Sequence, residues 1–581
     1  MPHLHLDLRQ ASSHLVLARL DLQPQRSLLR FALPAWTPGS YLIRDYVRQL
    51  EALEVRQSSH VMEPRRSGVN CWELDLPGLD PVEIHYRVMA TELTVRTCHL
   101  NDEHGFLALA AVALEVEGER WSPHGLSLAL PHGWSGFVPL PNGGPNQWRA
   151  VDFDQLIDSP VEVGPHREHR FTVAGVPHRW VSWGTTLNGL DLVDADPAWL
   201  EAVEQVCLAC CRAMGVEQPP CAIDGAAEGY LFVLHLTDSG YGGLEHDHSC
   251  VLQFGRRSLG KPDGRRKLLQ LVAHEYLHQW NVRRLRPAEL TPYRYGEPVV
   301  IPTLWFAEGI TSYLDQLLPH AAGLTSEAEV LEDLGSDLSR YLLSPGRCVQ
   351  SLKESSQEAW VKLYKPDSYS PNSQVSYYLK GAVVALVLDL QLRSSGSSLL
   401  AVLRELWQRF GVQGRGYREA DLIEVFARHS PALGEALPIW LRSAEDPPLE
   451  PLLLQMGLRL QVETSRLHWC GWELEDCSGE LRLRCVLRHS PAERAGLMIA
   501  DELLAVDGLR VRRPNDLDAV LQATTAPRPL RLLCCRDGVI QERQLAPEPP
   551  RPSRWWLEPD PLADAAAGAR RAAWLQLEEA S

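Results

Sequence analysis

The run His274-Glu275-Tyr276-Leu277-His278 decides more about this chain than any other stretch. It has the H-E-x-x-H form that metal-binding helices use. An α-helix turns about 100° per residue, so His274 and His278 lie one turn apart on the same face. Two imidazoles placed there can bind one Zn²⁺ at about 2.1 Å. Glu275 then lies beside the metal position and can take a proton from a zinc-bound water.

Apolar neighbours predict that this run belongs to a buried helix over about residues 264–282. Leu268, Leu271 and Val272 precede it, and Trp280 follows it. Because H-E-x-x-H is short and occurs by chance, the pattern alone leaves an ordinary buried helix as the alternative.

A second run, WFAEG at residues 305–309, supplies a third ligand. A catalytic zinc needs three protein ligands and one open position. Glu308 lies 30 positions after His278, in an apolar, helix-like segment. A carboxylate there is costly to bury unless a positive charge pairs with it, although a surface glutamate is the alternative. Together the two runs predict one Zn²⁺ per chain on His274, His278 and Glu308.

The two runs resemble the zinc helix and the third-ligand motif of the glycyl aminopeptidase family. This family of zinc metallopeptidases belongs to the gluzincins and is related to the membrane alanyl aminopeptidases. The run LPAWTPGSY at residues 33–41 resembles a segment typical of glycyl aminopeptidase relatives, which generic zinc peptidases lack. The resemblance implies a multidomain α+β protein with an N-terminal β-sandwich-like domain and a thermolysin-like, mainly helical catalytic domain.

The run YGGLEH at residues 241–246 resembles the G-x-M-E-N segment of related aminopeptidases. In those enzymes an edge strand pairs with the substrate backbone, and its glutamate holds the free α-amino group. The resemblance gives this role to Glu245, because a carboxylate must meet an α-ammonium group. Gly242 and Gly243 would let a peptide backbone approach closely. Leu replaces Met and His246 replaces Asn, and a Gly-Gly turn with a surface glutamate is the alternative.

The run SYYLKG at residues 376–381 resembles the Y-x-K-G run that supplies a catalytic tyrosine in the same enzymes. Tyr378 is the candidate, because a phenol aimed at the oxyanion stabilises that state more than the ground state. The alternative is that Tyr377 and Tyr378 are packing residues that head the helix at 382–392. Thermolysin-like enzymes also place an aspartate after the third ligand to orient a histidine. Here Asp315 lies further on, and the sequence does not assign that partner.

Composition narrows the class of protein. The chain has 581 residues, with 45% hydrophobic and 23% charged residues, as in ordinary multidomain proteins. A net charge of −17 argues against a nucleic-acid or anionic-membrane partner. No signal peptide and no membrane span of about 18 apolar residues is visible, so the expected location is cytoplasmic. The 13 cysteines are expected to be reduced thiols, and Cys207, Cys210 and Cys211 to be buried in a helix.

Four parts are expected: an N-terminal β domain at 1–165, the catalytic domain at 166–447, a PDZ domain at 451–545 and a Pro-rich tail at 546–581. The first part alternates polar and apolar residues as β-strands do, for example at 82–88. The tail is expected to end in a short helix near 563–579. The runs SPAERAGL at 490–497 and DELLAVDG at 501–508 resemble bacterial PDZ domains, which bind an extended peptide as an added strand. Trp574 and Leu575 are expected to dock the tail.

Function follows as a hypothesis: a zinc-dependent aminopeptidase that hydrolyses the N-terminal residue of peptides with a free N-terminus. A first residue of Gly or Ala is implied by the resemblance alone. A zinc endopeptidase would not need Glu245. The other alternative is a catalytically inactive metallopeptidase-like scaffold, which would only bind a peptide or protein ligand through its PDZ domain.

Overall fold

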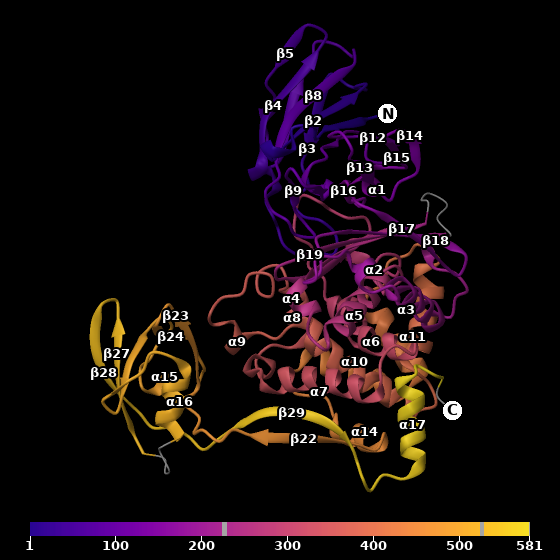
Figure 1. Cartoon of the computed structure of the whole chain (residues 1–581). Helices are drawn as coiled ribbons and strands as arrows, with labels where there is room; N and C mark the ends of the chain where they lie inside the picture. The colour runs from indigo at the N-terminus through magenta and orange to yellow at the C-terminus, as the bar shows by residue number, and fades with distance from the viewer. Residues whose placement is uncertain (223–228, 523–527, 580–581) are drawn as a thin grey trace. The chain divides into compact units, whose positions relative to one another are not determined.

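The computed structural model describes residues 1–222, 229–522 and 528–579 (Figure 1). It confirms a multidomain α+β protein with several sheets, a helical middle region and a smaller β-rich region near the C-terminus. The chain divides into two compact units. Unit 1 comprises Met1–Ile301, Leu314–Thr325 and Leu400–Leu422, and unit 2 comprises Pro302–Tyr313, Ser326–Leu399 and Ile423–Ser581.

The first 165 residues, all in unit 1, form three sheets. The largest has the order β14-β15-β12-β1-β2-β8-β4-β5. Its strands are β1 (His3–Asp7), β2 (Leu15–Leu22), β4 (Leu50–Gln57), β5 (His60–Met62), β8 (Val82–Met89), β12 (His124–Ala129), β14 (Asn142–Gly144) and β15 (Gln147–Ala150). Strand β8 buries every second residue, as its sequence predicts. The largely apolar run of β2 is a strand because β1 and β8 pair with it on both sides.

Two four-stranded sheets complete this region. Their orders are β13-β16-β10-β9 and β11-β3-β7-β6. The strands are β9 (Cys98–Leu100), β10 (Gly105–Leu107), β13 (Ser135–Phe137) and β16 (Val161–Gly164), then β3 (Leu28–Ala32), β6 (Arg65–Arg66), β7 (Cys71–Asp75) and β11 (Glu115–Val116). The short helix α1 (Phe153–Ile157) precedes β16.

Unit 1 also contains a five-stranded sheet after residue 165. Its order is β17-β18-β19-β21-β20, with β17 (Glu168–Val173), β18 (Val176–Trp183), β19 (Tyr230–Thr237), β20 (Tyr241–Glu245) and β21 (Ser249–Gly255). Strand β20 is an edge strand, antiparallel to β21. Helix α5 (Gly264–Leu277) contacts β20, β21 and helix α3 (Trp199–Met214) (Figure 1). Helix α3 buries its three cysteines as free thiols, as expected.

Unit 2 contains most of the helices. A π-helical turn, η6 (Trp305–Gly309), leads directly into α6 (Ile310–Ala321), whose residues from Leu314 on belong to unit 1. The other long helices are α7 (Glu327–Leu343), α10 (Tyr377–Ser394), α12 (Glu419–His429) and α13 (Pro431–Arg442). Helix α7 begins at Ser326, whose side chain and that of Glu329 form a reciprocal capping box. The segment at 344–376 contains the short helices α8 (Leu352–Gln357) and α9 (Ser370–Ser373).

One helical stretch, Ser370–Ser394, is long and apolar enough by length and composition to cross a membrane. Of its most apolar window, 78% is buried inside the structure. The core helix of a folded domain shows the same burial, so this stretch is weak evidence for a span.

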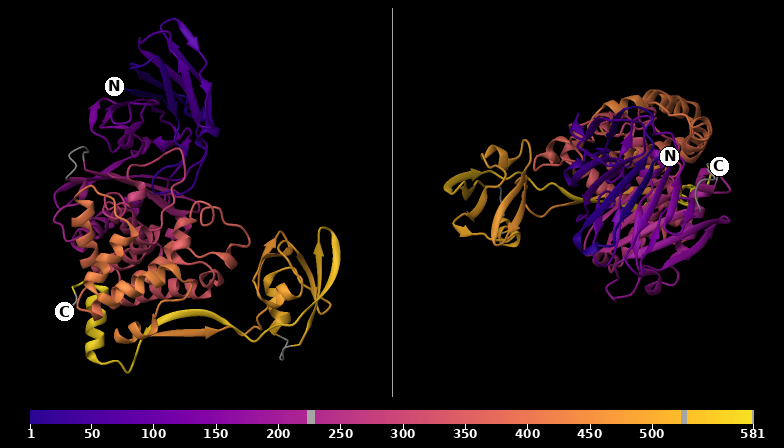
Figure 2. Two further views of the ribbon diagram at one scale, coloured as in Figure 1. Left: turned by 180° about the vertical axis from the view of Figure 1, so that it is seen from behind. Right: turned by 90° about the horizontal axis from the view of Figure 1, so that it is seen from above.

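The predicted PDZ domain forms the sheet β23-β24-β25-β27-β28 in unit 2. Its elements are β23 (Trp472–Cys477), β24 (Glu480–Val486), β25 (Glu502–Val506), β26 (Leu509–Arg510), β27 (Leu530–Arg536), β28 (Val539–Leu545), α15 (Pro491–Arg494) and α16 (Pro514–Gln522). Strand β22 (Leu458–Thr464) lies outside this sheet and pairs with β29 (Pro552–Pro559) from the tail (Figures 1 and 2). The tail ends in α17 (Ala565–Leu575), whose Trp574 is fully buried and donates to the Tyr313 hydroxyl at 2.7 Å, as docking of the tail predicts.

Candidate active site

Helix α5 presents the two predicted zinc ligands with their outer nitrogens already held. His274 Nδ1 lies 2.8 Å from Asp315 Oδ2, and His278 Nδ1 lies 2.6 Å from the Asn281 carbonyl. Metal-binding histidines commonly donate their second N–H to a carboxylate or carbonyl in this way. Nε2 is therefore the nitrogen of each ring that can bind a metal. Asp315 is the orienting aspartate that the sequence left unassigned.

Glu308, the predicted third ligand, lies in the π-helical turn η6 and is 2% exposed. One ligand atom from each of His274, His278 and Glu308 lies within 4.8 Å of the other two. Glu308 and Asp315 are seven residues apart along the continuous stretch η6–α6, which is about two helical turns and places them on one face. Asp315, which holds His274, is thus carried by the same helical stretch as the third ligand.

Two glycines fix Glu308 relative to the candidate tyrosine within unit 2. A Cβ added to Gly309 would lie 2.5 Å from the Cα of Gly381, and one added to Gly381 would lie 2.9 Å from the Cα of Gly309. Real side chains do not tolerate such distances, so η6 and α10 pack backbone to backbone here. Gly309 follows Glu308 directly, and Gly381 lies one helical turn after Tyr378 on α10. The close packing therefore sets the spacing of these two side chains.

Tyr378 and its neighbour differ in burial. Tyr377 is fully buried, whereas Tyr378 is only half-buried at the start of α10. Their hydroxyls lie 3.4 Å and 3.2 Å, respectively, from the hydroxyl of Tyr364. Of the two, Tyr378 is the more exposed to solvent.

Glu245 ends the edge strand β20 and faces the zinc helix inside unit 1. It is 3% exposed, and among the described residues its Oε1 has no hydrogen-bond partner. One ligand atom from each of Glu245, Glu275 and His278 lies within 4.8 Å of the other two. A buried carboxylate oxygen without a donor is costly, so this oxygen calls for a cation or donor from a ligand.

The two glycines of β20 serve different purposes. A Cβ at Gly243 would overlap the carboxylate of Glu275, so this glycine lets the general-base candidate lie against the strand. A Cβ at Gly242 would meet nothing within 4 Å. The sequence assigned both glycines to substrate approach, and only Gly242 faces open space.

His246 is held by an ion-pair network. Its Nδ1 lies 3.0 Å from Asp158, which also accepts from the Asp247 backbone N–H at 2.8 Å. Arg283, just beyond the zinc helix, contacts both Asp158 and Asp247 at 2.8 Å. Burial alone would raise the pKa of Asp247, but three arginines led by Arg283 outweigh it and hold that pKa far below its usual value. The network ties the end of β20 to the zinc helix.

A second buried cluster has a different pattern. Glu162 accepts from His104, His166 and His235 at 2.8–3.0 Å, and the atoms of Glu162, His104 and His235 lie close enough to hold a metal. Here the histidines direct their bonded nitrogens at the carboxylate itself, and the opposite nitrogens of His104 and His235 have no hydrogen-bond partner among the described residues. Metal-bound histidines need that outer partner, which His274 and His278 have. The cluster is therefore a carboxylate held by three N–H donors.

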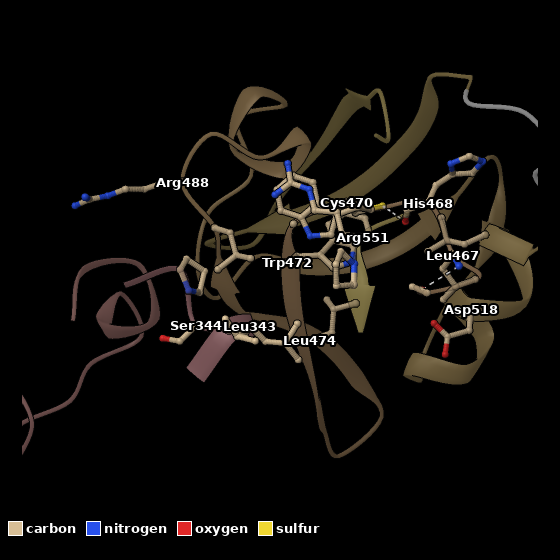
Figure 3. Close-up of a pocket in the computed structure, with 18 of the residues that line it drawn as sticks. Leu343, Ser344, Leu467, His468, Cys470, Trp472, Leu474, Arg488, Asp518 and Arg551 are labelled. Atoms are coloured by element: carbon tan, nitrogen blue, oxygen red, sulfur yellow. Dashed lines mark hydrogen bonds between the residues drawn. The ribbon is translucent and has the colours of Figure 1, made fainter. Parts of the chain in front are cut away.

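The PDZ domain has a groove between β23 and α16. A cavity of about 630 Å³ is lined by Leu474 of β23, Leu517 of α16 and the loop Cys470-Gly471-Trp472 (Figure 3). Strand β23 is the edge of its sheet, so its outer backbone groups can accept another strand. Arg488 and Arg551 also line the cavity.

Comparison with known proteins identifies the class. Residues 267–384 match the model of the M61 glycyl aminopeptidase, residues 3–165 match the M61 N-terminal domain, and residues 482–536 match a PDZ domain. The matched domains are those of a peptidase. The chain carries an M61 glycyl aminopeptidase domain, an M61 N-terminal domain and a C-terminal PDZ domain. The resemblance drawn from its motifs is confirmed.

Three solved structures are similar to all or part of the chain. An aminopeptidase N family protein from Idiomarina loihiensis is 27% identical, with a TM-score of 0.90 over 99% of this chain and 100% of that one. An M1 zinc metallopeptidase mutant from Deinococcus radiodurans, bound to a Tyr-Ser-Ala substrate, is 13% identical, with a TM-score of 0.48 over 77% of this chain and 94% of that one. The HtrA3 PDZ domain bound to a phage-derived ligand is 20% identical over 16% of this chain and 89% of that one, with a TM-score of 0.13. The search of curated proteins found no match.

Proposed function

We propose that the protein is a zinc-dependent aminopeptidase that hydrolyses the first residue, Gly or Ala, from peptides with a free N-terminus. The observation that carries the proposal is the closeness of Glu245, Glu275 and His278, whose ligand atoms lie within 4.8 Å of one another. One extended residue spans at most about 3.3–3.6 Å. A substrate whose ammonium group meets Glu245 therefore presents its first carbonyl at the metal position. An endopeptidase would need room for more residues there.

The side chains fit a zinc ion. His274, His278 and Glu308 form a His-His-Glu donor set, and the outer nitrogens of both histidines are held by Asp315 and by the Asn281 carbonyl. When bound, zinc lowers the pKa of a water and polarises the substrate carbonyl.

The other residues take separate roles. Glu275 takes a proton from the attacking water and gives it to the leaving amine. Tyr378 donates a hydrogen bond to the oxyanion. Glu245 holds the α-ammonium group and so sets the register at one residue.

The architecture is proposed in finer terms as well. Residues 1–165 would form a sandwich-like domain and 166–447 a thermolysin-like catalytic domain, followed by the PDZ domain at 451–545 and the tail at 546–581. The groove beside β23 would take an extended peptide or a protein segment, as PDZ domains do.

Replacement of the general base tests the proposal. Glu275→Gln should keep its zinc and lose turnover by roughly 10²–10⁴-fold, because the amide cannot accept a proton. Glu92→Gln, an exposed carboxylate paired with Arg48, is the matched control and should behave as the wild type. Turnover that survives Glu275→Gln would show that another group is the base. A wild type that holds zinc and cleaves no peptide would favour the inactive scaffold.

A further inference from the structure

The carboxylate of Glu245 is closed off on one side by a turn from the N-terminal region. Gly39 has a φ of +82°, and a Cβ added to it would lie 2.5 Å from Glu245 Oε2 and 2.7 Å from Oε1. The same Cβ would lie 2.6 Å from Leu244 Cδ1. The backbone of Gly39 therefore lies directly against the amine-binding carboxylate, about 200 residues away in sequence.

The turn is built rigidly. The Ser40 N–H donates to the Thr37 carbonyl at 3.1 Å, and Arg44 donates to the Ser40 hydroxyl at 3.0 Å. Trp36, just before the turn, is fully buried and donates from Nε1 to the Arg294 carbonyl at 2.9 Å. A turn anchored at both ends cannot move aside at low cost to admit a longer chain.

A second contact from the same region fixes the strand. Arg96 donates to the Gly243 carbonyl on β20 at 3.0 Å, and Tyr46 donates to the Arg96 carbonyl at 2.9 Å. An apolar core joins Val95 to Leu244 below them. One backbone acceptor of the edge strand is thus already used by the N-terminal region, and not left for substrate.

These contacts explain why the site would accept only a chain end. The Glu245 carboxylate lies against Gly39, and it also lies within 4.8 Å of ligand atoms of Glu275 and His278. The gap toward the metal position spans about one residue. Because the backbone of the turn lies against this carboxylate, a substrate residue preceding the amine would have to displace the turn.

We propose that the turn at residues 37–40 caps the amine subsite, with Gly39 as a specificity-determining residue and Arg96 as a positioning residue that holds β20 beneath it. This rests on the proposed aminopeptidase function. The turn from the N-terminal region then limits the site to substrates that end at the amine, so that one residue is released from the free N-terminus.

Gly39→Ala tests the cap, with Gly133→Ala as the matched control. Gly133 also has a positive φ, +83°, but a Cβ there would meet nothing within 4 Å. An alanine at 133 therefore has the same backbone strain as one at 39, without the contact to a neighbouring side chain. In Gly39→Ala the new methyl group displaces the Glu245 carboxylate. The KM for alanyl and glycyl 4-nitroanilides should rise by about tenfold or more with little change in kcat, since a charge-assisted contact to the amine is weakened. Gly133→Ala should keep both constants.

Arg96→Met covers the case in which Gly39→Ala does not fold. It should also raise KM more than kcat changes, while Arg48→Met, an exposed arginine paired with Glu92, should not. Wild-type KM in folded Gly39→Ala or Arg96→Met would overturn the cap. A wild type that cleaves N-acetylated peptides as fast as free ones would instead overturn the aminopeptidase proposal itself.

Discussion

Asp315→Asn should weaken zinc binding without unfolding the protein. The carboxylate of Asp315 lies 2.8 Å from His274 Nδ1, and each side chain is about one-seventh exposed, with values of 14% and 13%. The change keeps the size of the side chain but removes the charge that orients the imidazole and raises its basicity. Loss of such a partner typically lowers metal affinity by about 10–100-fold. One of the two histidines is affected, so His278 should keep its own orientation through Asn281.

The assay is competition for zinc against a chelator of known affinity, with the melting temperature of the metal-free protein as the folding check. Asp194→Asn is the control, since Asp194 makes only an exposed pair with Arg167 among the ion pairs found for it. The metal-free melting temperature of Asp315→Asn should stay close to that of the control. Zinc affinity equal to the wild type in folded Asp315→Asn would refute the argument that this aspartate orients a ligand.

Three further results are expected. Tyr378→Phe should lower kcat by about 10²–10³-fold with KM nearly unchanged, because the lost donor acts on the oxyanion. A rise in KM with kcat unchanged would contradict that role. Gly309→Ala should lower the melting temperature and the activity together, because its methyl group would meet Gly381 at 2.5 Å; wild-type values would show that the helices can separate freely. Burial alone would raise the pKa of Glu162, but its histidine partners hold it well below the usual 4.5, so its stabilisation is present above about pH 4.5 and lost as pH falls further. A Glu162→Gln variant should lack that part of the acid dependence in unfolding experiments.

Local patterns carried much of the prediction. The H-E-x-x-H spacing predicts two histidines on one helical face, and α5 presents them that way. Alternation at 82–88 predicts a strand, and β8 confirms it. Both are consequences of the chain's own periodicity, so a single sequence suffices to see them.

Contacts between residues far apart in the sequence could not be predicted in the same way. Asp315 could have been found from its spacing of seven residues after Glu308, which repeats a helical face, but the π-helical turn is not visible in the sequence. The contact of Gly39 with Glu245 joins a turn to a strand about 200 residues away, and the cluster around Glu162 joins β16 to β19. No local pattern encodes such pairs, because they depend on how the sheets pack.

The most direct measurement compares release of the first residue from a free peptide and from its N-acetylated form, by zinc-depleted protein before and after zinc is restored. Turnover should appear only on restoring the metal and only with the free amine. Equal cleavage of both peptides, or full activity in the depleted protein, would contradict a metal-dependent enzyme that binds the end of the chain.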